Sequence, residues 1–126
     1  MEGITKKQVL LAEDDDLLAS LLNYRLEKAG YAVHWSSDGK KVKEYLENEM
    51  PDIIVSDIMM PYFSGLELID FVRNTVQSDV PIIIISSAGN EENVLSAFDL
   101  GANDFISKPV SPSELLVRVN RELLKR

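Results

Sequence analysis

Hydrophobic and polar positions follow two different periods along this chain, and the two kinds of segment alternate from end to end. Short runs rich in β-branched and aliphatic residues predict five strands, at Val9–Ala12, Tyr31–Ser36, Ile53–Ser56, Ile82–Ser86 and Asp104–Ser107. Two of these runs, at 53–55 and 82–85, are apolar without alternation, which is typical of central strands covered on both faces. The run at 31–36 alternates more and indicates an edge strand.

Longer segments with helical spacing of apolar residues separate the strands. The first predicted helix has an inner face of five leucines and stops at Gly30. These leucines are Leu17, Leu18, Leu21, Leu22 and Leu26. The other predicted helices lie within residues 38–50, 64–75, 91–102 and 111–126. The last of them has Ser111 as its N-cap and Pro112 at its first position.

Strands that alternate with helices predict an α/β fold, in which helices cover both faces of a parallel sheet. A chain of 126 residues is long enough for one domain with a single core. We find no repeat, low-complexity tract or linker. We therefore expect a single domain over residues 1–126, with no output domain in this chain.

Composition and charge narrow the function classes. The chain carries 21 acidic and 13 basic side chains, a net charge of −8, which disfavours direct binding to nucleic acid. It has no cysteine, so disulfides and thiolate metal sites are excluded. No apolar stretch approaches the roughly 20 residues of a membrane helix, and "MEGITKKQ" lacks the apolar core of a signal peptide. We expect a cytoplasmic protein with no membrane contact.

Candidate chemistry lies where the predicted strands end. Four strands are followed by polar residues: Glu13 and Asp14, then Asp57, then Ser86 and Ser87, then Lys108. Each group has a plainer explanation by itself, as acids at a helix N-terminus, a turn residue or hydroxyls that bond the backbone. The C-terminal ends of parallel strands, however, meet at one edge of the sheet. The sequence therefore predicts a single site there.

The charges at this predicted site call for a cation. Two carboxylates about 4 Å apart repel each other by roughly 4 kcal/mol at an effective dielectric constant of about 20. Three of them beside Lys108 leave a net negative charge. Oxygen ligands without His or Cys indicate a hard metal, and carboxylates with waters and a phosphate are typical of Mg²⁺. Such a site suits phosphoryl transfer, in which a carboxylate attacks while cations neutralise the phosphoryl oxygens.

Four motifs together resemble the receiver domain of bacterial two-component response regulators. They are "VLLAEDD", "DIMMPYFSGLEL", "PIIIISSA" and "GANDFISKP", and the resemblance covers residues 8 to 125. It implies a flavodoxin-like, doubly wound sheet of five parallel strands in the order 2-1-3-4-5, with five helices. It also implies a phosphoacceptor switch that assists its own phosphoryl transfer and slow dephosphorylation, and that is not a conventional enzyme.

The resemblance assigns roles to the acidic residues. Asp57 would accept the phosphoryl group from a phosphohistidine of a sensor histidine kinase, from a phosphotransfer protein or from a small phosphodonor. Glu13 and Asp14 would bind Mg²⁺ together with Asp57, and the backbone carbonyl of Met59 would supply a further ligand.

The resemblance also implies a switch. Ser87 would turn inward to bond the phosphoryl group, Lys108 would pair with that group, and Phe105 would change its rotamer with Ser87. The Lys108–Pro109 peptide bond would be cis. The fourth helix, fifth strand and fifth helix would form the switched face, used for homodimerisation or partner binding. Met59 and Gly89 stand where the family places side chains that position the hydrolytic water, so we expect slow self-dephosphorylation.

Other classes explain fewer of these residues. Asp14 and Asp16 form a D-x-D pattern as in haloacid-dehalogenase-type phosphatases, but Leu18 stands where that motif has Thr or Val. The acidic loop after the first strand would repel the phosphate of a flavodoxin's flavin. No P-loop motif occurs. A degenerate receiver that acts only as a docking module would lack the acidic pair, the acceptor or the lysine, and all are present.

Overall fold

Five strands pair in parallel because a helical segment returns the chain to the same end of the sheet after each strand. The computed structural model describes residues 5–126. Its strands are β1 (Gln8–Ala12), β2 (Ala32–Ser36), β3 (Ile53–Asp57), β4 (Ile82–Ser86) and β5 (Asp104–Ser107). They form one sheet in the order β2-β1-β3-β4-β5. The predicted fold class and strand order are confirmed.

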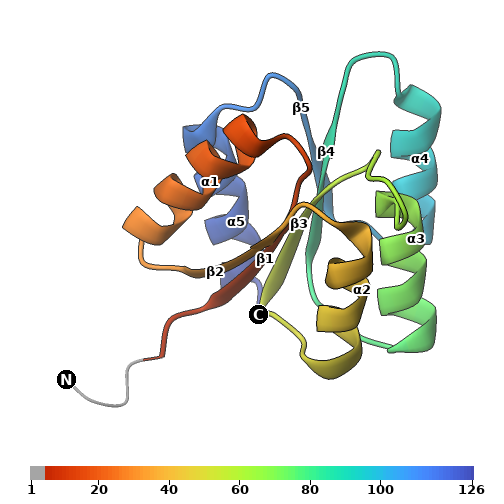
Figure 1. Ribbon diagram of the computed structural model, residues 1–126, viewed down its shortest axis with the longest axis horizontal. Coiled ribbons are helices and arrows are strands. Elements are labelled where there is room, and N and C mark those ends of the chain that lie inside the picture. Colours follow the sequence, from red (N-terminus) through yellow and green to blue (C-terminus); the bar gives the residue numbers. More distant parts are fainter. Residues whose placement is uncertain (1–4) are drawn as a thin grey trace.

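Helices cover both faces of the sheet. They are α1 (Asp16–Lys28), α2 (Gly39–Asn48), α3 (Gly65–Asp70), α4 (Glu91–Leu100) and α5 (Pro112–Leu124). Figure 1 shows α1 and α5 on one face and α2, α3 and α4 on the other. The expected single helix at 64–75 is instead α3 followed by a π-helical turn, η1 (Phe71–Thr75). Within residues 5–126, no helix has the length and apolarity needed to cross a bilayer.

Short polar residues start the helices where the sequence places them. The Asp15 carboxylate accepts the backbone N–H groups of Leu17 and Leu18 at the start of α1. Ser64 forms a capping box with Glu67 at α3. Ser111 caps α5, with Pro112 at its start as predicted. These caps satisfy backbone donors that a helix cannot pair internally, and the first of them lies directly beside the acidic loop after β1.

The core has two halves, one on each face of the sheet. Successive strand residues point to opposite faces, so Leu10 and Ile54 pack toward α2, α3 and α4. Leu11 and Val55 pack toward α1 and α5. Every residue of β3 and β4 is buried, as the uninterrupted apolar runs predict. The rigid sheet fixes the ends of β1, β3, β4 and β5 relative to one another.

The prediction for the inner face of the first helix is partly wrong. Leu22 and Leu26 are fully buried, but Leu17 is 83% exposed and Leu21 is 48% exposed. At 3.6 residues per turn, positions 17 and 21 lie on one stripe and positions 19, 22 and 26 on another. Ala19 takes the inward position instead. Five leucines cannot all face the sheet from this helix, and the apolar pattern alone did not show which would.

Candidate functional site

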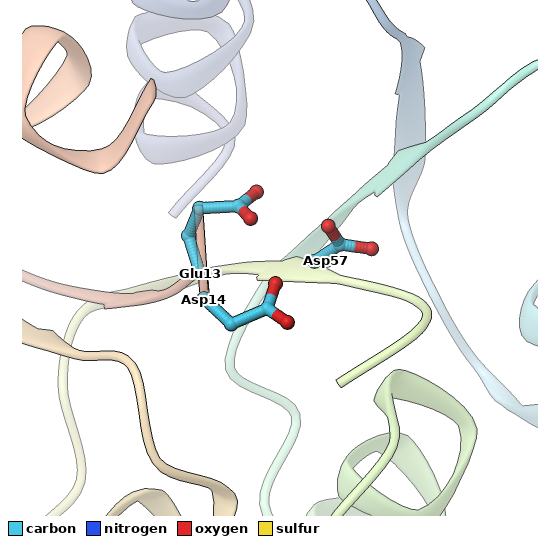
Figure 2. A group of neighbouring side chains, drawn as sticks. All are labelled: Glu13, Asp14 and Asp57. Atoms are coloured by element: carbon cyan, nitrogen blue, oxygen red, sulfur yellow. The ribbon is translucent and has the colours of Figure 1, made fainter. Parts of the chain in front are cut away.

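Three carboxylates meet where β1 and β3 end. Asp57 is the last residue of β3, while Glu13 and Asp14 directly follow β1. The two strands are neighbours, with Ala12 paired to Ser56, so the sheet register brings these residues together. One carboxylate oxygen from each of the three residues lies within 4.8 Å of the others. Figure 2 shows the three side chains grouped at this edge of the sheet.

Glu13 is the most constrained member of the group. The residue is fully buried. Its Oε2 accepts the backbone N–H of Asp15 at 3.0 Å, whereas its Oε1 is buried and has no hydrogen-bond partner among residues 5–126. Burial, with a smaller contribution from the nearby Asp57 charge, raises the pKa of Glu13 to about 7. A buried acceptor left unpaired is costly, and it marks a position that suits a cation.

Lys108, which follows β5, reaches into the carboxylate group. Its Nζ lies 2.6 Å from Asp57 Oδ2 and 3.7 Å from Glu13 Oε2. Burial by itself would lower the pKa of Lys108, but the hydrogen bond to Asp57 and the surrounding carboxylates outweigh it, and the pKa is raised. Lys108 is therefore an ammonium at neutral pH. The Lys108–Pro109 peptide bond is cis, as expected.

The donor set fits a hard divalent cation. Three carboxylates face the single ammonium of Lys108, and Glu13 Oε1 is unpaired. The group contains only oxygen donors, with no imidazole or thiolate, which matches the preference of Mg²⁺. Glu13, Asp14 and Asp57 could hold such an ion. The Met59 carbonyl remains a predicted ligand.

The loop after β3 fixes the Asp57 side chain from the other direction. Asp57 Oδ1 accepts the backbone N–H of Met59 at 2.9 Å. Gly65 at the start of α3 donates its N–H to the Ile58 carbonyl at 2.9 Å. A Cβ at Gly65 would lie 2.7 Å from Ile58 Cα, so this close approach of two backbone segments requires glycine. Both Asp57 oxygens are thus held in defined directions.

Ser87 and Phe105 lie beside this group and not within it. Both line an apolar hollow of about 340 Å³ between α4 and β5. The Ser87 side chain is exposed, and Phe105 packs edge-on against Phe98 with ring centroids 5.9 Å apart. Ser87 also lines a second hollow with Lys108. The structure therefore gathers Glu13, Asp14, Asp57 and Lys108, and leaves Ser87 at the rim.

Two residues of the site were not predicted. Asp15 caps α1, a role that its position just before an apolar helical run could have indicated. Trp35 is 36% exposed. Its indole N–H donates to the Glu13 carbonyl at 3.1 Å. No sequence pattern signals this bond, because it joins a side chain of β2 to a backbone atom of the loop after β1.

Comparison with known proteins identifies the family. A family model described as the response regulator receiver domain matches residues 9–120. A probable transcriptional regulator, ycf27 of Guillardia theta, is 38% identical over 97% of this chain and 47% of its own length. The alkaline phosphatase synthesis transcriptional regulatory protein PhoP of Bacillus subtilis is 35% identical over 95% of this chain and 49% of its own length. The chain spans about half the length of these curated relatives.

Solved structures agree with the sequence comparison. The receiver domain of the Francisella response regulator 1452 superposes with a TM-score of 0.87 at 32% identity, covering 95% of this chain and 98% of that one. The residues matched by the family model include Glu13, Asp14, Asp57 and Lys108. This chain therefore belongs to the response regulator receiver domain family of two-component signalling systems.

Proposed function

We propose that Asp57 accepts a phosphoryl group and that the gathered carboxylates and Lys108 support this transfer with Mg²⁺. The observation that carries the proposal is the meeting of Glu13, Asp14 and Asp57 within 4.8 Å around a buried, unpaired Glu13 oxygen. A carboxylate cluster that served only to cap a helix would leave no such oxygen buried. The family membership supports the same assignment.

The transfer follows from the contacts of Asp57. One Asp57 oxygen attacks phosphorus of the phosphodonor, an O–P bond forms, and the bond to the donor nitrogen or oxygen breaks. The Met59 N–H on Oδ1 and the Lys108 ammonium on Oδ2 hold the carboxylate in a fixed orientation. After transfer, Lys108 is placed to pair with the phosphoryl oxygens.

Glu13 and Asp14, together with Asp57 and the Met59 carbonyl, would hold the magnesium ion. When bound, Mg²⁺ supplies positive charge that stabilises the phosphoryl oxygens and relieves repulsion among the carboxylates. Glu13 and Asp14 would supply oxygen ligands for this, and burial keeps water away from Glu13 Oε1.

Phosphorylation would act as a switch on the face made by α4, β5 and α5. New acceptor oxygens at Asp57 favour a conformer in which Ser87 moves inward. Phe105 then turns into the hollow that it now lines with Ser87 and Phe98. The changed face would promote homodimerisation or the binding of another protein.

The proposed partner is a sensor histidine kinase or a phosphotransfer protein of a phosphorelay. The net charge of −8 supports a role that does not include direct binding to nucleic acid by this domain. In this role the domain is a cytoplasmic signalling switch, and the only reactions it assists are its own phosphorylation and slow dephosphorylation.

Intact-mass measurement after incubation with acetyl phosphate and Mg²⁺ tests this function. We expect wild type to gain the mass of one phosphoryl group. The gain should disappear in Asp57→Ala and on addition of a chelator, but persist in Asp99→Ala, which removes an exposed carboxylate on α4. An equal gain in Asp57→Ala, or no gain in wild type, would refute the proposal.

A further inference from the structure

The hydrogen-bond ladder between β1 and β2 ends beside the acidic pair. The Glu13 N–H donates to the Ser36 carbonyl at 3.2 Å, and the chain after Ser36 then turns toward α2. Within residues 5–126, no backbone N–H bonds the Glu13 carbonyl. The indole N–H of Trp35 bonds it instead, at 3.1 Å. The Trp35 side chain thus adds one hydrogen bond beyond the end of the β1–β2 backbone ladder.

The two peptide groups that flank Asp14 are both held. Trp35 holds the carbonyl of the peptide group before Asp14, and Glu13 Oε2 accepts the N–H of the peptide group after it. The Asp14 carboxylate itself makes no hydrogen bond or ion pair within the part of the chain that the structure describes. Its direction therefore depends on how these two peptide groups are fixed.

We propose that Trp35 is a positioning residue for the metal site, which orients Asp14 through the Glu13 carbonyl; this inference rests on the function proposed above. Trp35 is 36% exposed and borders a surface hollow with Asp16 and Lys41. It belongs to neither half of the core. Its indole hydrogen bond links it to the acidic loop after β1.

Replacement of Trp35 by phenylalanine separates the contribution of the indole hydrogen bond from that of aromatic packing. Trp35→Phe keeps an aromatic ring at the position and removes the donor. Mutation of a group that orients a metal ligand typically lowers metal affinity by about 10- to 100-fold. Trp35 acts through the backbone and on one ligand, so we expect Mg²⁺ affinity to fall by about tenfold, at the lower end of that range.

Tyr31→Phe is the matched control. Tyr31 directly precedes β2, at the end opposite Ser36, and its hydroxyl bonds the Asn120 side chain. The control therefore also removes one side-chain hydrogen bond from an aromatic residue beside this strand, but at the edge away from the carboxylates. A purely structural role for Trp35 predicts that both variants lose similar stability and retain the same Mg²⁺ affinity.

The test titrates MgCl₂ into wild type, Trp35→Phe and Tyr31→Phe, followed by the backbone amide NMR signals of Asp14 and Asp15. Urea unfolding in the presence of a chelator gives the stability of each variant. We expect weaker Mg²⁺ binding in Trp35→Phe alone. We also expect Mg²⁺ to shift the indole N–H signal of wild type, which is assigned unambiguously because the chain has one tryptophan.

The outcomes separate this inference from the proposed function. Wild type that binds Mg²⁺ with the same affinity as Trp35→Phe would overturn the role of Trp35 and leave the function intact. An equal loss of affinity in Tyr31→Phe would also overturn it, since the effect would then be a general one on β2. Wild type that does not bind Mg²⁺ would overturn both.

Discussion

A buried glutamate beside two other carboxylates is difficult to keep ionised, and Glu13 shows what this chain supplies in compensation. One of its oxygens receives the Asp15 N–H, and Lys108 lies 3.7 Å from the same oxygen. The other oxygen has no hydrogen-bond partner in the described part of the chain. Without a metal, the residue compensates by holding its proton more tightly, which is why its pKa is raised to about 7.

This raised pKa gives the metal-free protein a pH-dependent stability. The folded state holds the Glu13 proton up to about pH 7, whereas the ordinary pKa of this carboxyl group in an unfolded chain is 4.5. The stabilisation is present below pH 4.5 and is lost as pH rises through 7. One pKa unit corresponds to about 1.4 kcal/mol, so a rise from 4.5 to about 7 makes the loss on the order of 3–4 kcal/mol.

Glu13→Gln should remove this component, since glutamine does not titrate. In urea unfolding with a chelator, we expect the variant to be more stable than wild type at pH 8 and close to it at pH 4.5. Added Mg²⁺ should stabilise wild type at pH 8 and affect the variant less. Parallel stability profiles for the two proteins across this pH range would contradict the explanation.

If Asp57 accepts a phosphoryl group as proposed, we expect its slow loss to depend on Met59. This side chain is mostly exposed and has no group that activates or orients water. Met59→Asn should accelerate decay of the phosphorylated protein by roughly tenfold, which corresponds to about 1.4 kcal/mol of the barrier. Decay followed by intact mass measures this, with Met59→Leu as the control. An unchanged decay rate in Met59→Asn would exclude this explanation.

Gly89 is the other position where the family places a side chain that positions the hydrolytic water. It is less suitable for a test by substitution. Its φ of +91° is a conformation that side chains rarely adopt. Gly89→Glu would therefore combine a chemical change with backbone strain, and any effect on decay would have two causes.

At the scale of elements, the end of β3 is fixed by its contact with the start of α3. A Cβ at Gly65 would lie 2.9 Å from the Asp57 carbonyl and 2.7 Å from Ile58 Cα, both backbone atoms. The helix can approach this closely only because position 65 has no side chain, and the approach supports the loop that donates to Asp57.

Gly65→Ala should therefore destabilise the fold by about 1–3 kcal/mol, the usual cost of overpacking. It should also slow phosphorylation of the folded fraction, because the end of β3 must shift. Gly30→Ala is the control: Gly30 has a φ of +101°, but no atom of residues 5–126 other than those of Gly30 and its two chain neighbours lies within 4 Å of an added Cβ. It should cost about 1 kcal/mol and leave phosphorylation unchanged. Equal phosphorylation rates in the two variants would contradict this role of Gly65.

The elements themselves were largely predictable from the sequence because their signals are local. Apolar runs marked the strands, and the caps Ser111 and Ser64 lie where their helices begin. The convergence of Asp57 with Lys108 also followed, since parallel strands end at one edge. The exposure of Leu17, the π-helical turn η1 and the Trp35 bond were missed. All three depend on how elements pack against each other, which periodicity does not encode.

At the scale of the whole molecule, the face of α4, β5 and α5 carries exposed apolar side chains beside a charged network. Leu95 is 66% exposed and Val117 is 62% exposed. On the same face, Asp104 pairs with Arg118 at 2.8 Å and with Arg121 at 3.0 Å. An apolar patch with a polar border is typical of a protein contact surface.

Phosphorylation should promote association through this face. We expect sedimentation velocity to show a larger species in the presence of Mg²⁺ and beryllofluoride, a phosphoryl mimic. Leu95→Lys should abolish that species, since it places a charge in the patch, while Leu21→Lys on α1 should not. Identical sedimentation of wild type with and without the mimic would argue against homodimerisation.

The central claim, that Asp57 takes the phosphoryl group inside a pocket completed by Mg²⁺, is tested most directly by a crystal structure with Mg²⁺ and beryllofluoride. We predict beryllofluoride attached to an Asp57 oxygen and contacted by Lys108, with a metal ion bound by Glu13, Asp14 and Asp57. Beryllofluoride on another residue, or a metal ion not bound by Glu13 and Asp14, would contradict the claim.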